Sequence, residues 1–511
     1  MHEETELKLR IPEGAALSLR RSPVLSALKQ RRGSRRHLLT VYYDTPSLAL
    51  AKKGVSLRVR HMGRRKLQGI KLANGNEGGT IAQRPEIEME IAGDQPEIER
   101  IPDEKVRKLV SEAAGTEPLS PAFVSDFGRT VWPLKLGDSE IEVALDQGEI
   151  RAGADRALPV SEVELELKSG RPDKLIELAL ALGKSVPMSV ERQSKAERGM
   201  ALVAGLDLRP VRPTAVELNR NATAGEAFVI LARNCLAQLG GNEAAVQAGD
   251  AEGIHQMRVA ARRLRALLVC FSEVLAVQVA AEFKGELRWL MGALGPARDL
   301  DVFISETLDP MVERDADKDA LRTLRAAAWR MRERAHAEAR ATLATPRYTQ
   351  FLLTADLRLA SGDWALAGAS VGPPARAPAQ TMLRRRYRQL MKIGRGHRVL
   401  EVDELHKIRI VAKKMRYAGE FFRSLYPRKQ ARRFLMRLAE LQDRLGSLND
   451  AVTGRRLLEQ LLPQSGLEPL SVARIEGLVI GWQAARIDAD LSAFGAEWEK
   501  FQELKPFWVG R

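Results

Sequence analysis

Charged and apolar residues alternate in several short segments of the first 200 residues. The period is two in Glu4–Lys8, Leu57–Arg60, Glu86–Glu90, Glu142–Asp146 and Glu162–Lys168. Successive side chains of a β-strand point to opposite faces, so each segment predicts a strand with one apolar and one charged face. Carboxylates are concentrated on some of these strands and basic side chains on others.

Two architectures are compatible with such strands. An antiparallel sheet can leave its charged face in solvent, whereas a closed antiparallel barrel turns all the charged faces toward one lumen. Guanidinium and ammonium groups in a lumen would bind an anion with several phosphates. Carboxylates among them would repel this anion unless a cation lay between, and oxygen ligands select Mg²⁺ or Mn²⁺. The lumen would therefore hold a metal ion and a polyphosphate.

Six motifs of this half occur in a characteristic order: Glu4-Thr5-Glu6-Leu7-Lys8, Tyr43-Asp44-Thr45, Leu57-Arg58-Val59-Arg60, Lys71, the run Glu162–Glu166, and Ser194-Lys195-Ala196-Glu197-Arg198-Gly199. Together they resemble the CYTH domain, also called the triphosphate tunnel metalloenzymes, over residues 1–205. The resemblance implies an eight-stranded antiparallel β tunnel that hydrolyses triphosphates with a divalent metal ion.

The resemblance also implies roles for single side chains. The implied metal ligands are Glu4, Glu6, Asp146, Glu164 and Glu166, although Glu162 has the same parity as the last two. The implied phosphate ligands are Lys8, Arg58, Arg60, Lys71, Arg84, Arg129 and Lys195. The cation would neutralise the terminal phosphoryl group and acidify a bound water. Lys8, Glu4 and Glu6 are the expected catalytic residues, because a carboxylate or Lys8 could orient or deprotonate that water.

The character of the chain changes after residue 208. Prolines punctuate Arg209–Pro213, and this segment predicts a hinge. The residues that follow are rich in Ala, Leu, Arg and Glu, and stretches such as 317–343 predict helices. We therefore expect an α+β protein of two domains. The expected boundaries are 1–205 for the tunnel, 206–217 for a linker and 218–507 for an all-α domain.

An internal repeat runs through the helical half. The segment His255–Arg265 aligns with His406–Arg416 at an offset of 151 residues. The offset persists without a gap, since Leu290, Leu294, Gly295 and Asp299 fall on Leu441, Leu445, Gly446 and Asp450. This repeat predicts two copies of one helical unit, packed about a pseudo-twofold axis.

Each copy has one basic helix face. In a helix, His255, Arg258, Arg262 and Arg265 fall within roughly 80° of arc, opposite Met257. One such face is typical of a solvated amphipathic helix. Two facing stripes with the same histidine and the same basic spacing would instead form one cationic groove.

The net charge favours an anionic partner for this half. The chain carries +15, and its first 200 residues have 33 Lys and Arg against 30 Asp and Glu, so +12 lies beyond them. Aromatic residues make up 5% of the chain, which disfavours nucleic acid, because single strands stack on aromatic platforms. Inorganic polyphosphate requires only charge and hydrogen bonds.

The two basic segments resemble the CHAD domain over residues 218–507, with His255 and His406 as its histidines. The resemblance implies two four-helix units that form a basic channel for polyphosphate. Its expected ligands are His255, Arg258, Arg262, Arg263, Arg265, His406, Arg409, Lys413, Lys414 and Arg416. Lysines at 413 and 414 keep the charge but lose the forked geometry of arginine. His336 and His397 lie outside the repeat and are expected to face solvent.

Global features predict a cytoplasmic protein, and polyphosphate binding by the helices would place it at polyphosphate granules. Two cysteines, Cys235 and Cys270, predict no disulfide framework, and we expect neither a signal peptide nor a membrane span. There is no GxxxxGK[ST] loop. The expected function is hydrolysis of inorganic tripolyphosphate with long-chain polyphosphate binding by the helices. Two alternatives remain open: a non-catalytic polyphosphate-tethering protein, and a tunnel enzyme for a nucleotide or thiamine triphosphate.

Overall fold

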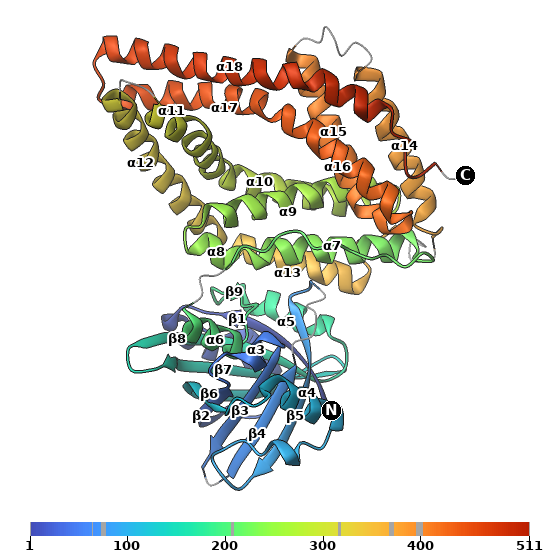
Figure 1. The fold of residues 1–511 in the computed structure, drawn as a ribbon. Helices are drawn as coiled ribbons and strands as arrows, with labels where there is room; N and C mark the ends of the chain where they lie inside the picture. The colour runs from blue at the N-terminus through green and yellow to red at the C-terminus, as the bar shows by residue number, and fades with distance from the viewer. Residues whose placement is uncertain are drawn as a thin grey trace. The chain divides into compact units, whose positions relative to one another are not determined.

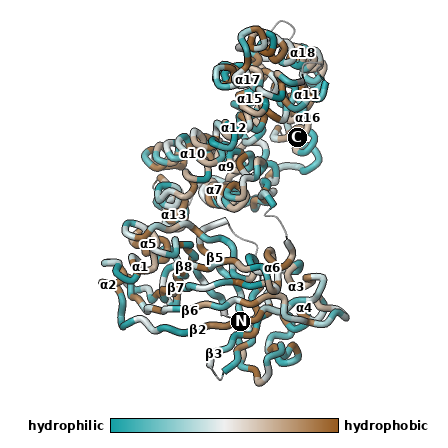
Figure 2. Tube along the Cα trace, turned by 90° about the vertical axis from the view of Figure 1, so that its left-hand side faces the viewer, coloured by the Kyte–Doolittle hydropathy of each residue, from teal (hydrophilic) through white to brown (hydrophobic). Residues whose placement is uncertain are grey.

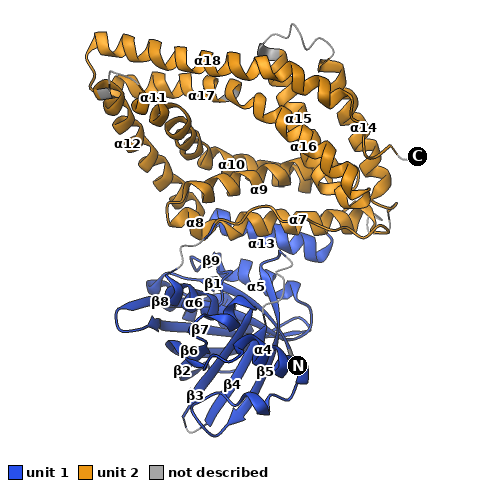
Figure 3. Ribbon diagram, in the orientation of Figure 1, with its two compact units in different colours: residues 1–209, 344–362 blue, residues 210–343, 363–511 orange. Residues whose placement is uncertain are grey.

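The computed structural model divides the chain into two compact units (Figure 3). Unit 1 contains residues 1–209 and 344–362, and unit 2 contains residues 210–343 and 363–511. The helical half is therefore not one continuous unit, because residues 344–362 belong to unit 1. The residues that the structure describes are 2–63, 65–72, 78–205, 209–314, 318–366, 372–394 and 402–509.

Unit 1 contains a closed antiparallel barrel of eight strands (Figure 1). The strands are β1 (His2–Arg10), β2 (Ser34–Asp44), β3 (Val55–Met62), β4 (Arg65–Leu72), β5 (Ile81–Ile91), β6 (Ser120–Leu136), β7 (Ser139–Ala152) and β8 (Arg156–Ser169). Their order is β5-β4-β3-β2-β6-β7-β8-β1, and pairing of β1 with β5 closes the ring. A short strand, β9 (Ser189–Val190), joins β1 from outside the ring. The predicted eight-stranded tunnel is confirmed.

Helices cover the apolar outer faces of the barrel. Leu57, Val59 and Ile70 of the strands form one core cluster with Val106 and Val110. The short helices of this unit are η1 (Glu13–Ala15), α1 (Ala16–Arg20), α2 (Pro23–Leu28), α3 (Ala49–Lys52) and η2 (Ile98–Arg100). The longer ones are α4 (Glu104–Ala114), α5 (Asp173–Leu182), α6 (Lys195–Ala204) and α13 (Pro346–Ser361). Because the apolar faces pack outward, the charged faces of the strands line the interior.

Unit 2 is helical. Its first part contains α7 (Ala224–Gly241), α8 (Glu243–Gln247), α9 (Ala251–Cys270), α10 (Val277–Phe303), the π-turn Ile304–Leu308, α11 (Asp309–Arg314) and α12 (Lys318–Leu343). Its second part contains α14 (Arg376–Ile393), α15 (Val402–Phe422), α16 (Arg428–Arg444), α17 (Gly446–Leu461) and α18 (Pro469–Gln502). Within single elements, hydrophilic and hydrophobic positions are mixed (Figure 2), as expected for elements that pack with one face. In the described part of the chain, no helix has the length and apolar character to cross a bilayer.

The internal repeat is visible in the helix boundaries. Helices α9, α10 and α12 begin at Ala251, Val277 and Lys318, and α15, α16 and α18 begin 151 residues later. The two copies differ at one point. Helix α10 continues through Gly295 and Pro296, whereas the equivalent stretch is split into α16 and α17.

The prediction that His336 faces solvent is wrong. Its side chain is 1% exposed, and its Nε2 lies 3.0 Å from Oδ1 of Asp301. The same oxygen accepts a hydrogen bond from Nε of Arg332 at 2.7 Å. The pattern of α12 did not reveal this contact because the acceptor comes from α10. His397 lies outside the described residues.

Candidate functional site

The barrel encloses a cavity of about 830 Å³. Most of the residues predicted for the site line it: Glu4, Lys8, Arg58, Arg60, Lys71, Arg84, Arg129, Glu164, Glu166 and Lys195. Glu6 and Asp146 lie beneath this wall, with 3% and 0% of their surface exposed. Glu162, the third candidate of the β8 run, is also fully buried. The strand alternation read from the sequence therefore brings these side chains together in one place.

A row of carboxylates crosses three neighbouring strands. Glu6 of β1 pairs with Glu166 of β8, which pairs with Glu142 of β7. Like charges directly opposite one another repel across a sheet. The pKa of Glu166 is raised above its ordinary value, because burial, Glu4 and Glu142 all disfavour its charged form. Lys168, 2.5 Å away, lowers this pKa and only partly offsets their effect. The positive charge of the neighbouring side chains therefore does not fully compensate the negative charge of this carboxylate row.

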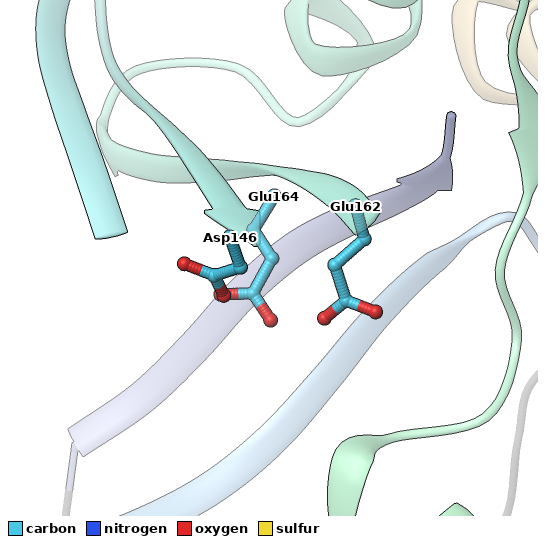
Figure 4. A group of neighbouring side chains, drawn as sticks. All are labelled: Asp146, Glu162 and Glu164. Carbon is cyan, nitrogen blue, oxygen red and sulfur yellow. The ribbon is translucent and has the colours of Figure 1, made fainter. Parts of the chain in front are cut away.

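A second carboxylate group has its own cations. Oxygens of Asp146 on β7 and of Glu162 and Glu164 on β8 lie within 4.8 Å of one another (Figure 4). Arg129 donates two hydrogen bonds of 2.7 Å to Asp146, and Lys195 donates to Asp146 at 2.7 Å and to Glu164 at 3.0 Å. Burial raises the pKa of Glu164, but Lys195, Arg129 and Lys8 hold it well below its ordinary value. These carboxylates are therefore already neutralised by protein cations.

Basic side chains of β3 form the opposite part of the wall. Arg58 donates to Glu86 at 2.6 Å and to Glu88 at 3.0 Å. Gly69 lies directly across from Arg58, where a Cβ atom would be 2.7 Å from the guanidinium Nε. Arg60 has a weaker partner, Glu88 at 3.5 Å. The pKa of Arg60 is lowered to about 10 by Arg58, by burial and by Arg129, and Glu88 raises it only in part. The positive charge of Arg60 is therefore poorly compensated by neighbouring carboxylates.

Lys8 is held in its charged form. Burial lowers its pKa, but Glu6, Glu164 and Glu4 outweigh burial and raise it above the ordinary value. Lys8 forms an ion pair with Glu6 and lies 3.9 Å from Glu164. A protonated ammonium donates hydrogen bonds and does not accept a proton. Of the two roles considered for Lys8, orienting a group therefore fits the structure better than deprotonating one.

Several residues of the lumen were missed by the site prediction. Glu86, Glu88 and Glu142 share the parity of predicted residues, which was the available signal. Arg198 of α6 forms a buried ion pair with Glu162, and no sequence pattern indicated this. Tyr42 lines the cavity and stacks on Phe123 with ring centroids 4.3 Å apart. Burial raises the pKa of Tyr42, but Arg58, Arg60 and Lys195 lower it below its ordinary value.

Unit 2 has a cationic cluster on three helices. Its members are His255, Arg258 and Arg262 of α9, Arg298 of α10, and Arg409 and Lys413 of α15. Helices α9 and α15 are in contact, which brings the two basic helix faces close together. Burial, Arg409 and Arg262 lower the pKa of Lys413 to about 7. Burial and Arg298 lower the pKa of His255 to about 4, so His255 is neutral at pH 7.

Carboxylates near this cationic cluster do not outweigh its positive charge. Asp299 raises the pKa of Arg258, and Asp450 raises those of Arg298, Arg409 and Lys413. All four pKa values are nevertheless lower than normal, because burial and the neighbouring cations dominate. The cluster is therefore suited to an anion.

The other predicted basic residues have different surroundings, although Arg416 also lowers the pKa of Lys413. Arg263 is 4% exposed and donates to Gln238 at 2.8 Å and to Asn234 at 3.0 Å, both on α7. One residue further along a helix turns a side chain by about 100°, which moves Arg263 from the basic face to the packed face. His406, Arg265 and Lys414 are exposed, and Arg416 lies 3.6 Å from Glu420.

Comparisons with known proteins also divide the chain into two parts. The CYTH domain model matches residues 2–200, and the CHAD domain model matches residues 230–459. A protein of Haemophilus influenzae named inorganic triphosphatase is 33% identical over 203 residues, which are 40% of this chain and 55% of that protein. An uncharacterized protein of Mycobacterium tuberculosis is 26% identical over 448 residues, 82% of each chain.

A solved structure resembles the helical half. The crystal structure of the CHAD domain from the plant Ricinus communis is 32% identical and covers 58% of this chain and 98% of its own, with a TM-score of 0.51. The closed barrel and the repeated helices agree with the two family matches. The chain therefore consists of a CYTH domain at residues 2–200 followed by a CHAD domain at residues 230–459.

Proposed function

We propose that the barrel hydrolyses inorganic triphosphate with a divalent metal ion and that the helical unit binds polyphosphate. One observation carries the first part: the barrel holds a row of facing carboxylates, Glu6, Glu142 and Glu166, and, on β3, the basic side chain of Arg60, whose partner Glu88 is 3.5 Å away. Such an interior suits a cation at the carboxylates and a polyanion at the basic side chain. The name of the Haemophilus influenzae relative supports the substrate class.

A divalent cation fits the carboxylate row. Oxygen is the ligand that Mg²⁺ and Mn²⁺ prefer, and a cation near Glu166 would relieve the repulsion from Glu4 and Glu142 that raises its pKa. Glu4, Glu6 and Glu166 are the proposed metal ligands. Glu142, which faces Glu166, is a further candidate, and Asp146 and Glu164 lie nearby. A bound ion supplies charge neutralisation at the terminal phosphoryl group and a more acidic water.

The basic side chains of the lumen would hold the phosphates. Arg60 is the first candidate because its charge is poorly compensated in the protein alone. Arg58, Lys71, Arg84, Arg129 and Lys195 are ion-paired with carboxylates and would exchange part of these contacts for phosphate oxygens. Lys8, which is protonated, would donate to a phosphate oxygen or orient the water. The proton of the water would then go to a carboxylate such as Glu4 or Glu6.

The cationic cluster of unit 2 supports the second part of the proposal. Five of its six side chains have pKa values lowered by burial and like charges, so an anion that replaces lost solvation would bind favourably. Inorganic polyphosphate supplies such an anion at every unit along its length. Bound polymer would place the barrel near a supply of phosphoanhydride bonds.

The substitutions Glu4→Gln and Glu6→Gln should each lower tripolyphosphate turnover at least a hundredfold, because they remove charge from the proposed metal site. The measurement is phosphate release from tripolyphosphate, ATP and thiamine triphosphate with Mg²⁺, with Mn²⁺ and with chelator. Glu149→Gln is the control, because Glu149 is a half-exposed carboxylate of β7 outside the cavity lining. Polyphosphate binding should survive all three substitutions.

Silence of the wild-type protein on all three substrates, with polyphosphate still bound, would instead identify a non-catalytic binding protein. Turnover of ATP or thiamine triphosphate in preference to tripolyphosphate would assign an organic substrate.

Affinity for Mn²⁺ should fall as the pH decreases through the raised pKa of Glu166. The reason is that protons compete for Glu166 at a higher pH than they do for an ordinary glutamate. Isothermal titration of the protein without substrate between pH 5 and pH 8 measures this. Glu166→Gln should weaken Mn²⁺ binding roughly tenfold or more and flatten the pH profile, whereas Glu149→Gln should do neither. Equal profiles for all three proteins would move the metal site elsewhere.

Neutralising the cationic cluster should weaken polyphosphate binding. Arg262→Gln combined with Arg409→Gln removes two charges, and the slope of log affinity against log salt should become shallower by roughly 0.7 per lost phosphate contact, as for single-stranded nucleic acids. Arg322→Gln with Arg428→Gln is the charge-matched control, because both arginines are exposed and lie outside the cluster. An equal loss of affinity in both double variants would attribute binding to net charge alone.

Polyphosphate should bind less tightly as the pH rises through about 7. Lys413 has its pKa lowered to about 7, and an anion favours its protonated form, so affinity decreases by up to tenfold per pH unit above that value. Titrations of wild type and Lys413→Arg at pH 6, 7, 8 and 9 measure this. Arginine keeps its charge throughout, so the variant reports the titration of the ligand itself. Parallel profiles would show that Lys413 does not contact the anion.

A further inference from the structure

Helix α13 belongs to unit 1 although its sequence lies inside the CHAD match. Residues 344–362 cluster with the barrel, and Figure 3 shows them in the colour of unit 1. The helix packs on α5 and β9. The helical half of the sequence thus contributes a helix to the unit that contains the lumen.

Asp356 of α13 holds the turn before β5. Its side chain is 4% exposed, and its Oδ2 accepts hydrogen bonds from the backbone N–H of Thr80 at 2.5 Å and from Thr80 Oγ1 at 2.6 Å. A Cβ atom at Gly79 would lie 3.1 Å from the same oxygen, so glycine leaves room for the carboxylate. Arg192 donates to the carbonyl oxygen of Gly79 at 3.2 Å.

A second contact of α13 lies beside β9. Thr349 Oγ1 donates a hydrogen bond of 2.9 Å to the carbonyl oxygen of Met188. Met188 immediately precedes β9, which pairs with β1 at Leu9 and Arg10. These two side-chain contacts of α13 therefore reach backbone next to the strands that pair with β1.

The turn at Thr80 immediately precedes β5, the strand whose pairing with β1 closes the barrel. Ile81 follows it and pairs with Leu7, the residue between Glu6 and Lys8. Further along the same pairing, Arg84 of β5 lies opposite Glu4 of β1. A shift at the start of β5 would displace these two strands against each other, and one residue of slip reverses which side chains face the lumen.

We propose that Asp356 is a positioning residue of the lumen, which fixes the start of β5 and thereby the β1–β5 seam that presents Glu4, Glu6, Lys8 and Arg84. A buried carboxylate that accepts a backbone N–H makes a charge-assisted, directional hydrogen bond, which suits this role. The assignment of a catalytic consequence rests on the proposed function, whereas the effect on the seam does not.

Hydrogen exchange of the full-length protein tests the effect on the seam. Asp356→Ala should increase amide exchange at least fivefold in peptides of β1 and β5, with little change in peptides of β6 and β7. Thr80→Val removes one of the two donors and should have a smaller effect, and combining it with Asp356→Ala should add nothing. Leu352→Ala is the matched control, because Leu352 is buried on the same helix but is separate from the Thr80 turn. Unchanged exchange at the seam, or the same pattern in Leu352→Ala, would overturn the proposal.

Kinetics with tripolyphosphate test the catalytic consequence. Asp356→Ala should raise KM several-fold more than Leu352→Ala, compared at a temperature where both proteins are fully folded, because displaced phosphate ligands weaken binding. Equal KM changes would reduce Asp356 to a structural role and overturn the positioning assignment. A wild-type protein without turnover would refute the proposed hydrolysis, and the exchange data would still decide whether Asp356 holds the seam.

Discussion

Closure of the barrel is the constraint on which unit 1 depends. Once β1 pairs with β5, the charged faces of the strands meet around a cavity of about 830 Å³. Charges in such a place must be matched by other charges, since desolvation alone is costly. The lumen achieves this match in most places, as in the Arg129, Lys195 and Asp146 contacts. At Glu166 and at Arg60 the match is incomplete, and a ligand of opposite charge would complete it.

The cationic cluster of unit 2 has a different arrangement of charges. In the lumen, carboxylates and basic side chains lie within hydrogen-bond distance of one another. Helices α9 and α15 instead bring basic side chains close to other basic side chains. Helix packing supplies the energy for this arrangement, because Met257, Leu264 and Met415 are buried. Under the proposed function, the two units would bind two kinds of anion. Unit 1 would take a short anion together with a metal ion, and unit 2 would take a long anion bound by charge alone.

Strand alternation is a local property, so it predicted that Glu4, Arg58 and Glu164 lie on charged strand faces. The resemblance to the CYTH domain implied that these faces meet in the lumen of a barrel, where the three residues line the cavity. Contacts that depend on packing between distant segments were not predictable. Arg198 reaches Glu162 from α6, Asp356 reaches Thr80 from a segment 276 residues away, and His336 finds Asp301 on another helix. The error at Arg263 has a local cause, since a single helical step separates an anion-facing side chain from a packed one.

The two helical copies differ at the buried contact of His336. At the offset of 151 residues, Asp301, Arg332 and His336 correspond to Val452, Gln483 and Ile487, so all three charged or titratable members have been exchanged together for uncharged ones. The two equivalent positions are also packed differently, because Asp301 is 7% exposed whereas Val452 is 70% exposed. The copies are therefore not interchangeable at this contact: a chain with α18 in the place of α12 would leave Asp301 as a buried charge without Arg332 and His336.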